Sequence, residues 1–502
     1  MTNTLRLFKN QETDTFKTNG MDLTDYREQL AHDRNSRTLT LRRMKKPTIA
    51  QFLNQGQKNP LNSPLIDINN FPFLDINYAI TQLNNGNPTS LSEFLNSLTV
   101  CATTTPRLVS NLAQTPELSE PFVTALTAGY SEQITIQLIR AMIAIFPISG
   151  DNRTLFVDDG LTQSLYEFLS SQSLPLLESS IALVCVMSDY SSYANDSVLS
   201  FGIHQFLIEI ATKEYNEQIT LQALDVLNRI FSPGYNLSSE KKYKIDADIL
   251  TSSVELMKPL LDIHSVQAIS SALMCFVAMT DQMAFLVFNL YDLQLFPKIV
   301  DFLKVPELIS SALPLIGNMS ICHPTHVETL LQLGLFDILM KLMDTEYTAD
   351  VYWVLSNLVE SVPHKTVNLF NQQFIDNTID IAMRSSFDVK KESSFFLATL
   401  TMFVANDDLI YFMNVNVLEL MFEMLSCNII LIVLRCLDAL IRFSKVFETR
   451  TPSEEFIAMF RGEEFISILN DLVSNENVQS IQKRAELLLD FVEGDSPSLL
   501  AC

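Results

Sequence analysis

Hydrophobic residues recur along most of this chain at the spacing of one face of a helix. In one segment Leu335, Ile338, Leu339 and Leu342 fall at i, i+3, i+4 and i+7, and so share a face. Similar stretches rich in Leu, Ile, Met and Phe follow one another from about residue 75 to 493, without the period-two alternation of half-buried strands. The pattern therefore predicts an all-α body.

The helical pattern repeats along the chain. Gly160, Gly202 and Gly334 each precede an amphipathic segment, and a second helical segment follows each of these. Aligning the second segments gives register positions about 40 residues apart, except where the loop SPGYNLSSEKKYK lengthens one interval; they are Arg140, Ile181, Gln222, Ser271, Pro314, Trp353 and Phe395.

A repeat of roughly 40 to 47 residues with two or three helices is typical of armadillo and HEAT arrays. Such repeats bury their apolar faces only by stacking, and the stack curves into a superhelix with a long concave surface. We therefore expect a right-handed superhelical armadillo-repeat solenoid of about ten repeats. It would span residues 75–493, after a flexible arm (1–59) and a linker (60–74) and before a short tail (494–502).

Charge divides the chain into two unlike parts. The whole carries a formal charge of -24, but residues 1 to 50 hold ten Lys/Arg against six Asp/Glu, or +4. The remaining 24 Lys/Arg and 52 Asp/Glu give -28 for the rest of the chain. A body this acidic repels a polyanion, so we expect no direct nucleic-acid binding.

No pattern of catalytic, metal-binding or membrane-spanning residues stands out. The seven cysteines lack paired spacing, and CHPTH at 322–326 fits a turn better than a zinc site. No phosphate-binding glycine loop occurs, and apolar runs are too short to cross a bilayer. We expect a protein-binding monomer of cytoplasm and nucleus that is not an enzyme, uses no cofactor and does not insert into membranes.

Several segments, in one order, resemble importin alpha, the adaptor that carries cargo with basic signals into the nucleus. SALPLIGNMS, DVYWVLSNLVES and VKKESSFFLATLT are similar to three consecutive armadillo repeats of that family, which places tryptophan-x-x-x-asparagine on the third helix of each repeat. FKTNGMDLTDYREQL and SRTLTLRRMKK look like its importin-beta-binding arm. The resemblance covers about residues 14 to 493.

The resemblance implies a cargo site in the concave groove. Trp353 and Asn357 lie at i and i+4, so an indole able to pack a lysine stem would sit beside an amide able to bind a peptide backbone. A minor-site-like set would comprise Trp353, Asn357, Asn318, Phe395 and Glu392, with Asp189 as a remnant of the major site. The alternatives are a core tryptophan, a helix-capping or solvated Asn318, and plain surface acids at 189 and 392.

The groove departs from the family at most slots. Trp353 is the only tryptophan in the chain, and only Asn318 and Asn357 fill the asparagine slots; the others read Ala144, Cys185, Val226, Cys275 and Thr399. Valine and alanine cannot bind a peptide backbone through their side chains. We therefore expect basic cargo to bind weakly, or only around Trp353.

The arm would bind importin beta through a set of basic residues, by resemblance to the family: Arg27, Arg37, Arg42, Arg43, Lys45 and Lys46. A merely solvated charge cluster is the alternative. The element that folds back into the family's groove is replaced here by LNQGQ at 53–57, so we expect weak autoinhibition.

Three functions stay open. The first is an import adaptor with importin beta and basic-signal cargo as partners; an export receptor, which the family's C-terminal repeats engage, stays an open third partner. The second is an armadillo or HEAT scaffold or assembly chaperone without a transport role. The third is a protein that sequesters importin beta without binding cargo.

Overall fold

The structure, a computed structural model, describes residues 74–85, 87–213, 216–232, 244–427, 429–447, 452–475 and 478–494. The arm residues expected to bind importin beta, almost all of the 60–74 linker, and tail residues 495–502 lie outside the described residues. Within them every regular element is a helix, with no strand.

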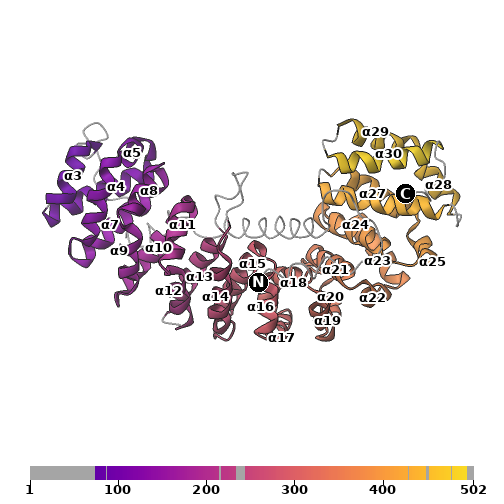
Figure 1. Ribbon diagram of the computed structural model, residues 1–502, viewed down its shortest axis with the longest axis horizontal. Coiled ribbons are helices and arrows are strands. Elements are labelled where there is room, and N and C mark those ends of the chain that lie inside the picture. The colour runs from indigo at the N-terminus through magenta and orange to yellow at the C-terminus, as the bar shows by residue number, and fades with distance from the viewer. Residues whose placement is uncertain are drawn as a thin grey trace.

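One series of long helices runs through the whole body, and each member packs against the next. We call these ten described helices the inner helices, because they stack one on the next and, in the middle of the arc, lie on its concave side (Figure 1). They are α4 (Pro88–Thr104), α7 (Glu132–Ile145), α10 (Leu174–Tyr190), α13 (Glu217–Phe231), α15 (Val266–Gln282), α18 (Pro306–Met319), α21 (Thr348–Ser361), α24 (Phe387–Thr401), α27 (Ile430–Val446) and α30 (Gln479–Glu493).

Shorter helices complete each repeat, most of them on the convex side. The α-helices among them are α3 (Ile76–Asn85), α5 (Pro106–Ala113), α6 (Ser119–Thr127), α8 (Asn152–Asp158), α9 (Leu161–Leu169), α11 (Ser192–Ser200), α12 (Ile203–Thr212), α14 (Ala247–Met257), α16 (Leu286–Asp292), α17 (Phe296–Phe302), α19 (Pro324–Gln332), α20 (Leu335–Leu342), α22 (Pro363–Thr366), α23 (Gln372–Arg384), α25 (Asn406–Leu409), α26 (Val415–Leu425), α28 (Glu454–Phe460) and α29 (Glu463–Asn475). Short 3-10 turns join some of them: η4 (Pro116–Leu118), η5 (Phe146–Ile148), η7 (Lys258–Leu261), η8 (Val367–Leu369) and η9 (Ile410–Phe412).

The observed repeat follows the sequence pattern. Each of the seven register positions lies on an inner helix, from Arg140 on α7 to Phe395 on α24. Gly160, Gly202 and Gly334 precede α9, α12 and α20 with φ of 104°, 72° and 81°. Only glycine adopts this left-handed conformation without steric cost, so it allows a sharp turn between two short helices. The predicted all-α armadillo-type solenoid is confirmed.

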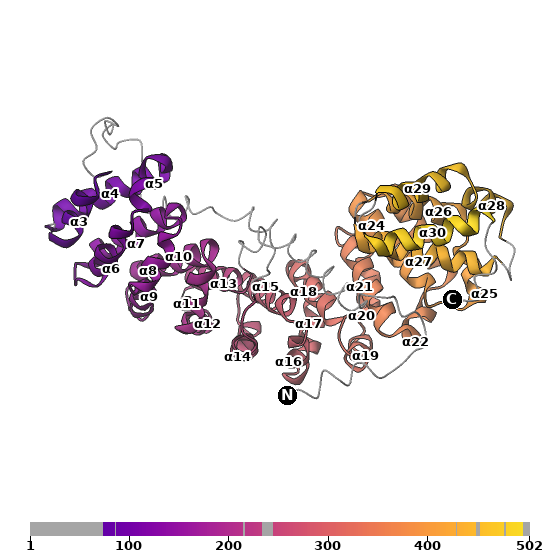
Figure 2. The same ribbon diagram turned by 45° about the horizontal axis from the view of Figure 1, so that its top comes forward.

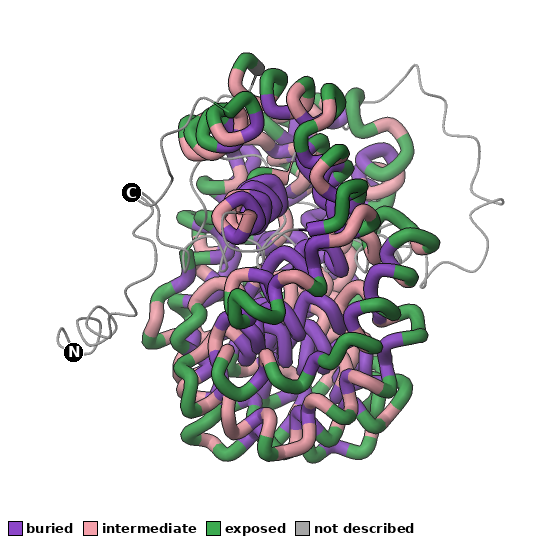
Figure 3. The backbone as a smooth tube through the Cα atoms, turned by 90° about the vertical axis from the view of Figure 1, so that its right-hand side faces the viewer, coloured by how far each residue is buried: buried purple, intermediate pink, exposed green. Residues whose placement is uncertain are grey.

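The core is continuous along the rod. Buried apolar side chains form one cluster from Ala79 in α3 to Val492 in α30. Figure 3, which looks along the rod from its C-terminal end, shows this buried material in the middle with exposed residues around it. Figure 2 shows that the last repeats, with α26, α27, α29 and α30, form a thick end to the arc. None of the described helices is both long and apolar enough to cross a membrane.

Candidate functional site

Trp353 lies in the contact between two inner helices. Its side chain on α21 is 2 % exposed, and the six-membered part of its indole rests on Gly317 of α18. A methyl group on Gly317 would lie 2.2 Å from ring carbon Cη2, so the ring can come this close only because residue 317 has no side chain. The expectation that this indole faces an open groove is wrong: it is a buried side chain packed on the neighbouring repeat.

The two asparagines expected to bind cargo backbone are buried and donate to the preceding repeat. Asn357 Nδ2 donates to the carbonyl oxygen of Gly317 at 3.2 Å. Asn318 Nδ2 donates to Thr280 Oγ1 at 2.9 Å. Since a buried amide needs a hydrogen-bond partner, these contacts hold α15, α18 and α21 in register. Exposure of these amides in a groove is not observed.

Phe395 and Glu392 are buried on α24 as well. Glu392 is 4 % exposed, with Lys391 Nζ 3.4 Å from its carboxylate. The ring of Phe395 lies beneath Arg435 of α27, with the guanidinium carbon 5.8 Å from the ring centre. Neither side chain presents the open lysine pocket that the resemblance implied.

Asp189 remains half-buried and carries an ion pair with an inner-helix arginine. Its carboxylate on α10 accepts from Nη1 of Arg229 on α13, whose Nε lies 3.4 Å from Asp225. The three side chains are 14 to 17 % exposed, so their charges meet where water is partly excluded. The acid expected to pair with a cargo lysine is therefore already paired with a guanidinium of the chain itself.

A second ion pair links repeats that are not neighbours in sequence. Arg435 on α27 donates to Glu360 on α21, and both side chains are nearly inaccessible. The pair spans 75 residues and passes beside Phe395 of the intervening helix. The repeat spacing of about 40 residues could have suggested that Phe395 and Arg435 are neighbours, but it gave no sign of a contact two repeats away.

The inner helix α13 carries a polar stripe. Gln218, which is exposed, and Gln222, Asp225 and Arg229, which are partly buried, recur every three or four positions and so share a face. Gln222 Nε2 also donates to the carbonyl of Glu178 on α10 at 3.0 Å. The outer helix α12 and the inner helices α10 and α15 also pack against α13.

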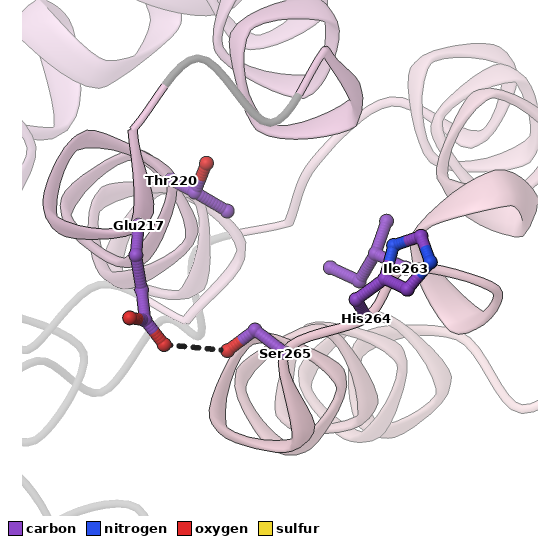
Figure 4. Close-up of a pocket in the computed structure, with 5 residues that line it drawn as sticks. All are labelled: Glu217, Thr220, Ile263, His264 and Ser265. Carbon is purple, nitrogen blue, oxygen red and sulfur yellow. Dashed lines mark hydrogen bonds between the residues drawn. The ribbon is translucent and has the colours of Figure 1, made fainter.

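A hollow of about 390 Å³ lies between the first turn of α13 and the residues just before α15. It is lined by Glu217, Thr220, Ile263, His264 and Ser265 (Figure 4). The hydroxyl of Ser265 donates to the carboxylate of Glu217 at 3.0 Å, which leaves the hollow polar on one wall and apolar at Ile263. This arrangement supplies no nucleophile or metal-ligand set.

Side chains of the types that bind metals are dispersed over the part of the chain that the structure describes. Among these residues no three His, Cys, Asp or Glu side chains come together as metal ligands would. In the CHPTH segment, Cys322 Sγ lies 3.3 Å from His326 Nδ1. Burial raises the pKa of the Cys322 thiol to about 11, so it stays protonated at neutral pH.

Comparison with known proteins supports the fold alone. No protein-family model and no curated protein matches the chain. An engineered protein of known crystal structure is similar at 14 % identity and a TM-score of 0.61, over 83 % of this chain and 98 % of that one. Two designed armadillo repeat proteins, one in complex with the peptide (KR)4, are 14 % identical over 57 % of this chain and nearly all of theirs. Their TM-score of 0.36 carries no argument. The chain thus shares its fold with an engineered protein of known structure, and importin alpha stays a resemblance.

Proposed function

We propose that this protein is an adaptor that binds importin beta through its basic arm and holds a second protein along its inner helices. The observation that carries the proposal is the unbroken series of inner helices, which offers one extended face along the whole rod. An extended face of stacked helices suits a partner that lies along it, because each repeat adds a similar contact.

Charge supports the arm's part in this function. Residues 1 to 50 carry +4 and the rest of the chain -28. A basic segment joined to an acidic body can be drawn to an acidic partner at a rate that depends on ionic strength. Nuclear import of basic-signal cargo is the transport role that the resemblance implies for such an arrangement.

One specific observation favours the second function, a scaffold or assembly chaperone without a transport role. The side chains expected to bind lysine are buried or already ion-paired: Trp353 packs on Gly317, and Asp189 binds Arg229. A partner of such a scaffold would lie along the polar stripe of α13 without needing a run of lysines.

The test separates these two functions in the full-length protein. The variant changes four arm residues together to Glu: Arg42, Arg43, Lys45 and Lys46. Its binding to immobilised importin beta is measured. The matched control changes four exposed lysines of the body to Glu, at Lys258, Lys304, Lys341 and Lys365, which alters the net charge equally. We expect the arm variant to lose binding and the control to keep it. The adaptor function would be ruled out, in favour of the scaffold function, if the wild-type protein did not bind importin beta or if the arm variant bound it as well as wild type does.

A further inference from the structure

The hollow between α13 and the residues just before α15 contains a buried hydroxyl group without a hydrogen-bond partner. Thr220, in the first turns of α13, is 3 % exposed, and its Oγ1 has no partner in the described part of the chain. Figure 4 shows its side chain directed across the hollow toward Ile263. Buried hydroxyl groups usually have a partner, because leaving one without a hydrogen bond costs free energy. This hydroxyl is therefore available to a molecule that enters the hollow.

A second inner helix begins with the same four residues, but its threonine has a partner. Both α7 and α13 start with the sequence Glu-Gln-Ile-Thr. In both, the glutamate accepts a hydrogen bond from the N-cap serine of the next inner helix, in the pairs Glu132–Ser173 and Glu217–Ser265. On α7, Thr135 Oγ1 donates to the carbonyl oxygen of Ser131 at 3.3 Å. The hydroxyl of Thr220 makes no such bond, which distinguishes the start of α13 from that of α7.

The hollow places acceptors for a cation beside an apolar surface. The Glu217 carboxylate accepts from Ser265 at 3.0 Å, and a carboxylate has about four acceptor positions. The hydroxyl of Thr220 can also accept a hydrogen bond. Ile263, on the other side of the hollow, is apolar and can pack against a chain of methylene groups. The set therefore suits a group that carries only N–H donors on an aliphatic stem.

Size and charge limit what the hollow can hold. Ligand sites have volumes of roughly 300–1,000 Å³, so a hollow of about 390 Å³ suits one small molecule or one side chain. The N–H groups that begin α13 and α15 would favour an anion, but the side chains of Asn216 and Ser265 already accept from them. Glu217 adds a negative charge at the same place, and the chain beyond residue 50 carries -28. A cation is therefore favoured over an anion.

We propose that this hollow binds a primary ammonium group on an aliphatic chain, with the ammonium held by Glu217 and Thr220 and the chain packed on Ile263. An ammonium has three N–H donors and no acceptor, so it can donate to the carboxylate and to the hydroxyl together. The group can belong to a free alkylamine or to a lysine side chain. The inference goes beyond the proposed function, because neither the arm nor importin beta takes part in it.

The experiment observes the hollow in the full-length protein. Isoleucine methyl groups are labelled for nuclear magnetic resonance, and the signal of Ile263 is identified by its loss in Ile263→Val. Pentylamine and a lysine blocked at its α-amino and carboxyl groups are titrated separately, with pentanol as the neutral control. We expect a saturable shift of the Ile263 signal with pentylamine and none with pentanol, while Ile134 on α7 stays unchanged.

The two amines distinguish the sources of the ammonium group. A shift with both amines supports a site that accepts lysine side chains as well as free amines. A shift with pentylamine alone supports the inference for small amines. No saturable shift with either amine, or an equal shift with pentanol, would overturn the inference.

Variants test the assigned contacts. Glu217→Gln keeps the shape of the side chain but removes its charge, and it should weaken amine binding about tenfold or more, the effect of losing a charge-assisted hydrogen bond. Its matched control is Glu132→Gln, at the first position of α7, which should bind as wild type does. Both glutamates are exposed, so we expect both variants to fold. Wild-type affinity in Glu217→Gln would overturn the inference.

The buried hydroxyl is tested separately. Thr220→Val removes it at nearly constant volume and should weaken amine binding about threefold or more, whereas Thr220→Ser keeps the hydroxyl and should bind about as wild type does. The signals of the other isoleucines show whether each variant is folded. Equal affinity in Thr220→Val and wild type would contradict the inference, because water alone would then satisfy the hydroxyl.

Discussion

Trp353 and Gly317 are a pair in which one residue's missing side chain makes room for the other's ring. Gly→Ala inside a helix ordinarily stabilises it by about 1 kcal/mol. Here the added methyl would lie 2.2 Å from the indole, and such overpacking costs about 1–3 kcal/mol. We therefore expect Gly317→Ala to destabilise the protein, as measured by urea unfolding.

The control for this prediction removes the ring. In a Trp353→Leu background the same Gly317→Ala change should become neutral or stabilising, because the clash is gone and the helix propensity remains. Stabilisation by Gly317→Ala in the wild-type background would show that the indole does not rest on residue 317.

His204 makes stability depend on pH. It lies on α12 at 2 % exposure, and burial lowers its pKa to about 4. The ordinary value near 6.5 applies to the unfolded chain, so the unfolded state binds the proton more tightly. The contribution of this residue is therefore complete above pH 6.5 and is lost as pH falls toward 4, by up to roughly 3 kcal/mol.

His204→Leu should remove this part of the acid sensitivity. The expected result is that wild type loses more stability than the variant between pH 7 and pH 4.5, as measured by thermal or urea unfolding at both pH values. Parallel losses in the two proteins would mean that the imidazole is not held neutral by burial.

At the scale of elements, two arginines donate hydrogen bonds to carbonyls at the ends of inner helices and so bridge neighbouring helices. Arg153 on α8 donates through Nε to the carbonyl of Phe146 and through Nη1 to that of Tyr190, each at 3.0 Å. Arg442 on α27 donates to the carbonyl of Thr401, at the end of α24, and to that of Val404, just beyond it. Carbonyls at a helix end lack partners within the helix, so these guanidinium groups satisfy them.

Arg153→Met should therefore cost about 1–3 kcal/mol, because it leaves partly buried carbonyls without a donor while keeping much of the side-chain volume. Urea unfolding measures the cost. Arg107→Met, at an exposed position of α5, is the control and should change stability by less than about 0.5 kcal/mol. Equal effects at both positions would mean that the bridging hydrogen bonds do not stabilise the joint.

At the scale of the whole molecule, stability should be local. In a stack of repeats each unit contacts mainly its neighbours, so a defect spreads over a short distance. Leu138 is fully buried on α7, and its change to Ala should cost about 2–5 kcal/mol. We expect hydrogen exchange to become faster in α4, α7 and α10, with α27 and α30 unchanged. Equal loss of protection throughout would contradict a repeat-by-repeat architecture.

Much of this architecture could be predicted from the sequence. Apolar spacing identified the helices, glycines at 160, 202 and 334 located turns, and the interval of about 40 residues identified which helices stack. These are local or periodic features, and each repeat imposes the same requirement on its residues.

The candidate site could be predicted only in part. Trp353 and Asn357 were correctly placed on one helix beside each other, but their exposure was not. Helical spacing tells which residues share a face, whereas burial depends on what the neighbouring repeat presents to that face. Glycine at 317 admits the indole, and no periodic pattern reveals that contact.

Composition and periodicity, which are properties of the chain alone, are enough to predict an all-α repeat body, strongly acidic behind a basic N-terminal segment. The stacking of the repeats, in contrast, is what pairs the asparagines with neighbouring repeats and brings Arg229 and Arg435 to carboxylates of other inner helices. Arg435 and Glu360 lie 75 residues apart, and two charges so distant in sequence meet only when stacking brings their helices together.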